Sequence, residues 1–197
     1  MRAPAAAVLA LPGVALGVVG LFHPMQLSYD TSRTWWLLHV PGLFVFPLVG
    51  VALMVLFRGR RDVVAVLAVL SAFAYATAYT ALDVVSGMAA GYVTHRLGPG
   101  VPRPDEVRHL FALGRPFGEW GSWALLLAAV LVAGDALWRH GLRAVPAVAM
   151  VLGAYLVHVS HIFAPEGVAG MVLVGLSTAW VAYVQPDQRA GRALAGT

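Results

Sequence analysis

The chain has 197 residues, of which 60% are hydrophobic and only 11% are charged, and its mean hydropathy is +0.79. A soluble domain carries about 25% charged residues, so this composition excludes an ordinary water-soluble fold. The chain has no Cys, which excludes disulfides, a thiol nucleophile and a Cys-ligated metal. The formal charge of +4 comes with Arg as the only basic residue besides His, and no basic stripe typical of nucleic-acid binding is present.

Six runs of apolar residues are each long enough to cross a bilayer as a helix, which takes about 20 residues. The sequence therefore predicts an all-α fold, a polytopic integral membrane helix bundle with six transmembrane helices in one domain, 1–197. The predicted helices cover residues 3–22, 35–57, 63–92, 116–138, 145–163 and 168–184. The third run is longer than one crossing requires, so we expect it to tilt or to project beyond the lipid.

The connection 93–115 is the only long one and is rich in Gly, Pro and Arg. Within it, Pro104, Asp105 and Glu106 are typical of a helix N-terminus, and Gly114 is typical of a C-terminus. The apolar residues between these ends predict a short interfacial helix that lies flat on the membrane.

The distribution of Arg predicts the orientation, because cytoplasmic loops carry an excess of basic residues. With both termini in the cytoplasm, eight Arg lie inside and five lie outside. The inner ones are Arg2, Arg58, Arg60, Arg61, Arg139, Arg143, Arg189 and Arg192, and the outer ones are Arg33, Arg96, Arg103, Arg108 and Arg115. We therefore expect a multi-pass protein of the cell membrane with both termini cytoplasmic.

The third predicted helix carries a polar stripe in which Ser71, Tyr75, Tyr79 and Asp83 recur every four residues. Side chains spaced in this way lie on one face of a helix. We expect this face to point into the bundle, where the hydroxyl groups form either part of a functional site or a hydrogen-bonded seam between helices. A carboxylate at membrane depth is costly, so Asp83 is a candidate functional residue.

Glu119 and Ser122 share a face at the start of the fourth predicted helix, and Trp120 and Trp123 lie beside them. The positive end of the helix dipole stabilises the anionic form of a carboxylate in a first turn. Glu119 is therefore either a candidate catalytic residue or only an N-terminal charge, and the two tryptophans either line a pocket or anchor the helix at the interface.

Six of the seven histidines are expected near the same membrane boundary as Asp83 and Glu119, namely His23, His39, His95, His109, His158 and His161. His158 and His161, which follow Tyr155, are three residues apart, a spacing that can chelate a metal ion, and His23 and His39 lie near the ends of two other predicted helices. These four are candidate metal ligands, whereas haem would need two of them to face each other across the bundle. The alternative is that they are partly hydrated interfacial residues.

Five stretches of the chain, 23–24, 35–39, 46–47, 81–87 and 161–167, carry a resemblance. They resemble a group of small multi-pass membrane proteins of actinobacteria. The resemblance implies a membrane helix bundle over most of the chain and implies no activity.

The function that these residues favour is an integral membrane enzyme. It would use acid–base chemistry, like that of a terpene cyclase, on a lipophilic substrate such as an isoprenoid, in a pocket near one membrane face. Such chemistry needs a carboxylic acid that holds its proton at neutral pH, which burial favours. The predicted catalytic residues are Asp83, Glu119, His39 and His158, and the predicted pocket residues are Tyr75, Tyr79, Trp120, Trp123 and Tyr155.

Three alternatives remain open at this point. The first is a His-ligated metal or haem protein, and the second is a proton-coupled transporter with Asp83 as its titrating group. The third is a structural membrane partner without chemistry. The enzyme interpretation needs no cofactor, and its expected partners are the lipid bilayer and a small lipophilic substrate.

Overall fold

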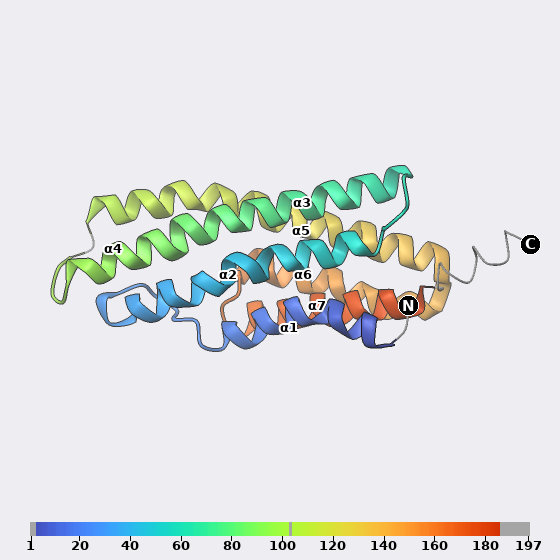
Figure 1. Ribbon diagram of the computed structural model, residues 1–197, viewed down its shortest axis with the longest axis horizontal. Helices are drawn as coiled ribbons and strands as arrows, with labels where there is room; N and C mark the ends of the chain where they lie inside the picture. The colour runs from blue at the N-terminus through green and yellow to red at the C-terminus, as the bar shows by residue number, and fades with distance from the viewer. Residues whose placement is uncertain (1–2, 103, 186–197) are drawn as a thin grey trace, which may run out of the picture.

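The computed structural model describes residues 3–102 and 104–185, and within them every regular element is a helix. The all-α prediction is therefore confirmed. The elements are α1 (Ala3–Gly20), α2 (Tyr29–Val55), α3 (Val63–Leu82), η1 (Asp83–Ala89), α4 (Ala90–Leu97), α5 (Asp105–His140), η2 (Gly141–Ala147), α6 (Val148–Ser160) and α7 (Glu166–Val184). Figure 1 shows them side by side along one long axis.

Five helical runs in the described part of the chain are long and apolar enough to cross a membrane, which indicates a multi-pass membrane protein. The sequence predicts six, and the difference lies in Asp105–Ser160, which counts as one run because α5, η2 and α6 follow one another without a loop. The chain nevertheless changes direction between α5 and α6. Gly141 has a positive φ of 58°, and α6 packs back against α5.

The predicted interfacial helix does not exist as a separate element. Asp105 begins α5, which continues through Pro116 without a break to His140. Gly114 does not end a helix, because it lies where α5 touches η1 and where a Cβ atom would overlap Ser86. The glycine therefore permits a close approach of two helices.

Helix α2 begins at Tyr29, six residues before its predicted start. A capping box explains the difference, because the amide of Thr31 donates to Ser28 Oγ and the amide of Ser28 donates to Thr31 Oγ1. These bonds satisfy two amides that a helix start otherwise leaves without a partner.

Two helices are far longer than the bilayer requires. The continuous run Val63–Leu97 has 35 residues and α5 has 36, which correspond to lengths of about 52 and 54 Å at 1.5 Å per residue. The hydrocarbon core is only about 30 Å thick. Both helices extend beyond the end of α1, at the end of the bundle where α4 meets the start of α5 (Figure 1).

The run Val63–Leu97 contains a seven-residue π-helical segment, η1, in the middle of a helix that is otherwise α-helical. Such segments are rare and often occur at functional sites. Three of its residues, Asp83, Ser86 and Gly87, are buried against neighbouring helices. These three residues of the π-helical segment therefore face the bundle interior.

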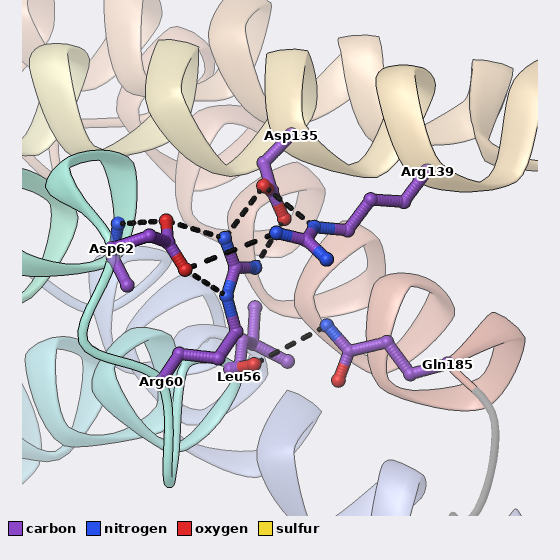
Figure 2. A network of polar contacts seen from close by, with 7 residues as sticks. Leu56, Arg60, Asp62, Asp135, Arg139 and Gln185 are labelled. Atoms are coloured by element: carbon purple, nitrogen blue, oxygen red, sulfur yellow. Dashed lines mark hydrogen bonds and ion pairs between the residues drawn. The ribbon is translucent and has the colours of Figure 1, made fainter.

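The opposite end of the bundle carries an ion-pair network, drawn in Figure 2. The Arg60 guanidinium donates to both carboxylate oxygens of Asp135, at 2.6 and 2.8 Å, and to both of Asp62. Arg139 donates to Asp135 at 2.9 Å. The Asp62 carboxylate also caps α3, and its hydrogen bonds with Arg60 hold the pKa of Asp62 well below its usual value. The network ties the α2–α3 turn to α5.

Four of the arginines used to predict the orientation, Arg2, Arg103, Arg189 and Arg192, lie outside the described residues. The start of α1, the α2–α3 turn and the end of α7 lie at one end of the bundle (Figure 1). The assignment of this end to the cytoplasm stays a prediction.

Candidate functional site

A cavity of about 750 Å³ lies beside the α1–α2 connection, in the half of the bundle away from the start of α1. Its wall is formed by the α1–α2 connection, α2, the end of α3, η1, α5, the end of α6 and the α6–α7 connection. Ligand sites usually measure about 300–1,000 Å³, so the cavity has the size of a small-molecule site. Its lining residues are His23, Trp35, His39, Tyr79, Leu82, Ser86, Gly87, Phe111, Arg115, Gly118, Glu119, Ser122, Val157, His158, Val159, Ser160, His161 and Phe163.

The structure brings most of the predicted site residues to this cavity. His39, His158 and Glu119 line it, as do His23, His161 and Tyr79. Tyr75 is fully buried one turn deeper along α3, with its ring centroid 4.7 Å from that of Tyr79.

Three predicted pocket residues lie elsewhere. Trp120, Trp123 and Tyr155 are 64%, 53% and 53% exposed, and none of them lines the cavity. The two tryptophans each follow a lining residue by one position, which turns them about 100° around α5 and away from the cavity. Their placement fits the alternative interpretation as interfacial anchors.

The polar stripe of α3 points into the bundle, as predicted. Ser71, Tyr75, Tyr79 and Asp83 are all buried, and Asp83 is only 1% exposed. Ser71 donates to the carbonyl of Leu67 on its own helix, at 2.8 Å. Among the described residues, the Tyr75 hydroxyl and both Asp83 oxygens are buried without a hydrogen-bond partner.

His39 and Asp83 are placed by a reciprocal arrangement of two glycines. A Cβ atom on Gly87 of η1 would overlap the His39 imidazole of α2, and a Cβ atom on Gly42 of α2 would overlap the Asp83 carboxylate of η1. Each helix therefore offers a glycine to the ionisable side chain of the other. As a result the two side chains lie next to each other, with His39 Nε2 3.8 Å from Asp83 Oδ1.

The hydrogen bonds of His39 define which ring nitrogen carries the proton. Nδ1 lies 2.7 Å from the carbonyl oxygen of Trp35, which can only accept, so Nδ1 is the donor. Nε2 of the neutral ring then has a lone pair, and it is the atom that faces Asp83. At 3.8 Å the two groups are close enough to interact electrostatically, but they do not form a direct hydrogen bond. His39 lines the cavity and Asp83 does not.

The wall formed by α5 and α6 has its own polar pair. Ser122 Oγ lies 2.9 Å from His158 Nδ1 and donates to the carbonyl oxygen of Glu119 at 2.9 Å. The His158 ring also packs on Trp123 at 4.4 Å between centroids. Glu119 and Arg115 are exposed as well as lining the cavity, so the cavity opens to the surface beside them.

The four candidate metal ligands line one cavity but do not converge on one point. Within the described ranges, no group of three or more His, Asp or Glu side chains is arranged to hold a metal ion. His23 and His39 are neighbours with ring centroids 5.1 Å apart, whereas the ring of His161 packs against those of Phe46 and Tyr79, which also touch each other.

Sequence reasoning missed the residues that position the others. Gly42 and Gly87 shape the site because they have no side chain. Trp35 makes two hydrogen bonds: its carbonyl oxygen accepts from His39 Nδ1, and its Nε1 donates to the carbonyl of Ser86 at 3.1 Å. Trp35 and Gly87 lie within stretches that carry the resemblance, and Gly87 also continues the polar face of the third predicted helix, four residues after Asp83.

Comparisons of this chain with protein-family models, with curated proteins and with solved structures gave no match, so its fold and the geometry of its cavity are the basis for inferring its function.

Proposed function

We propose that this chain is an integral membrane enzyme that performs acid–base chemistry on a small lipophilic substrate held in the cavity. The observation that carries the proposal is the cavity itself, an apolar space lined by ionisable side chains from several helices. Binding sites for small molecules are typically apolar with a few placed polar groups, and ionisable residues at membrane depth usually serve a function.

The His39–Asp83 pair is the proposed proton donor. With Nδ1–H committed to Trp35, the pair holds one further exchangeable proton, either on the carboxyl group or on Nε2. Both forms leave the pair neutral overall, which reduces the cost of keeping two ionisable groups in an apolar place. His39 borders the cavity and delivers the proton, while Asp83 behind it stores the proton.

Glu119 on the α5 wall is the proposed proton acceptor. The His39–Asp83 pair gives a proton to a carbon–carbon double bond, and Glu119 removes a proton from a carbon beside the resulting cation. The electrons of that C–H bond form the new double bond, so the product is an isomer or a cyclised isomer of the substrate. The exposed Glu119 then releases its proton to water, and the His39–Asp83 pair takes up a proton from water through the open cavity, which restores both groups. Aromatic rings such as Tyr79 stabilise the cation.

For the membrane arrangement, we propose six crossings with both termini in the cytoplasm. Residues Gly141–Ser160 span about 34 Å, because η2 contributes seven residues at about 2.0 Å and α6 thirteen at 1.5 Å. This exceeds the core thickness of about 30 Å. The Arg-rich end near Arg60 and Arg139 would then face the cytoplasm, and the cavity would open on the outer side.

The enzyme proposal is tested by solvent deuterium labelling. Purified protein in lipid nanodiscs is incubated in D₂O with geranylgeraniol and, separately, with a lipid extract of the native membrane, and the lipids are analysed by mass spectrometry. Protonation at carbon predicts a protein-dependent gain of deuterium. His39→Gln and Glu119→Gln should each lower this rate by about 10²–10⁴-fold, the usual contribution of a general acid or base.

Two matched controls lie on α5 outside the cavity, His109→Gln and Glu106→Gln, and both should label at the wild-type rate. The proposal is overturned if no lipid gains deuterium with the wild-type protein, or if His39→Gln and Glu119→Gln keep full activity. A Soret band in the purified protein would instead favour the haem alternative.

A further inference from the structure

His23 occupies a rigid position on the cavity wall and has no role in the proton transfer described above. It follows α1, is only 7% exposed and lines the cavity. Three rings surround its imidazole at centroid distances of 4.7 Å for Trp35, 5.1 Å for His39 and 4.8 Å for Phe163. The ring is therefore held in one orientation by edge-to-face contacts.

The hydrogen bond of His23 determines what its free nitrogen can do. Nδ1 lies 2.8 Å from the carbonyl oxygen of Pro24, which only accepts, so Nδ1 carries the proton. The ring is buried among aromatic side chains, and burial favours the neutral imidazole. Nε2 then has a lone pair and can only accept a hydrogen bond.

No described residue supplies a donor to this atom, because His23 Nε2 is buried without a hydrogen-bond partner. The two neighbouring rings that own N–H groups use them elsewhere. Trp35 Nε1 donates to the carbonyl of Ser86, and His39 Nδ1 donates to the carbonyl of Trp35. Buried polar atoms in proteins are nearly always paired, and His23 is a residue of the cavity wall, so its unpaired acceptor points to a donor on the ligand.

We propose that the ligand of this cavity is a lipophilic alcohol or phenol whose hydroxyl group donates to Nε2 of His23. The inference rests on the proposed function and narrows its substrate class. A plain hydrocarbon, an ether or a ketone has no donor, and each would leave Nε2 unpaired in an apolar wall. The hydroxyl group also fixes which end of a long apolar molecule enters beside His23 and His39.

The test compares geranylgeraniol with its methyl ether, which has the same chain and oxygen but no donor. Equilibrium binding to the full-length protein in nanodiscs is followed by Trp fluorescence, since Trp35 lines the cavity. The alcohol should bind the wild-type protein about tenfold more tightly than the ether, as expected when one buried hydrogen bond is lost. This comparison needs no variant.

His23→Phe keeps a ring in the cage and removes the acceptor, so the alcohol and the ether should bind it equally. His109→Phe makes the same change on the exposed part of α5 and should keep the tenfold preference. Equal binding of both probes to the wild-type protein would overturn this inference and leave the proposed function intact. Binding of neither probe would overturn both.

Discussion

The reciprocal glycine arrangement is tested by Gly87→Ala. A Cβ atom at this position would overlap the His39 ring, and even Nε2, the farthest of the three ring atoms it would meet, would lie only 2.8 Å away. Ordinary contact begins at 3.4 Å, so the imidazole must move by more than about 0.6 Å. Overpacking of this kind costs about 1–3 kcal/mol.

Two further effects determine the net change in stability. Movement of His39 weakens its 2.7 Å hydrogen bond to Trp35, which costs about 1 kcal/mol. Alanine gains about 1 kcal/mol over glycine in helix propensity, which offsets this loss. We therefore expect the free energy of unfolding to fall by about 2 kcal/mol, or about 6 °C in Tm for a chain of this length.

The assay is thermal unfolding in one detergent at a fixed scan rate, followed by circular dichroism. Gly134→Ala is the matched control, because Gly134 lies in α5 and a Cβ atom added there would have no neighbour within 4 Å. This variant should be as stable as the wild type or more stable. If Gly87→Ala unfolds at the same temperature as Gly134→Ala, the His39 ring does not occupy the space beside Gly87 and the reasoning is refuted.

Two further predictions concern the ion-pair network. Asp135→Asn leaves Arg60 and Arg139 without their shared carboxylate, whose side chain is only 8% exposed, and should lower the free energy of unfolding by about 2–3 kcal/mol. Asp105→Asn, at an exposed pair, should change it by less than about 0.5 kcal/mol, and equal losses would contradict the assignment. Asp62→Asn keeps the helix cap but loses the charge. Because the folded-state pKa of Asp62 is lowered, its contribution is complete above the unfolded value of about 3.9 and is lost as the pH falls below it. The Tm difference between the wild type and Asp62→Asn should thus be constant from about pH 7 to 5 and shrink below about pH 4, whereas a difference that grows on acidification would argue against the pairing.

The sequence predicted the parts of the site that follow from helical spacing. The four-residue repeat that ends at Asp83 identifies a buried face, because one helix alone fixes which side chains share a side. It did not predict that Gly42 and Gly87 receive the facing side chains, since that depends on how closely α2 and η1 approach each other. The π-helical segment was also missed, because nothing in the composition of residues 83–89 distinguishes it from an α-helix.

The errors in element boundaries have local causes. Pro104–Glu106 correctly marks a helix start, but Gly114 and Pro116 resemble a helix end followed by a new start. In the structure both lie inside α5, where Gly114 makes room for Ser86. Prolines are in general tolerated inside membrane helices. A breaker residue in a membrane helix is thus weaker evidence for a boundary than in a soluble one.

The contact between α2 and η1 also fixes the register of the two helices. A slide of α2 by one turn, about 5.4 Å, would replace Gly42 with Leu38 or Phe46 opposite Asp83, and neither leaves room for a carboxylate. It would also remove His39 from the side of Asp83 and leave an ionisable group against apolar side chains, at a high cost in the membrane. Only the observed register seats both side chains in glycine gaps, and this register brings His39 to the cavity wall. The packing of these two helices and the proposed proton transfer therefore depend on the same two glycines.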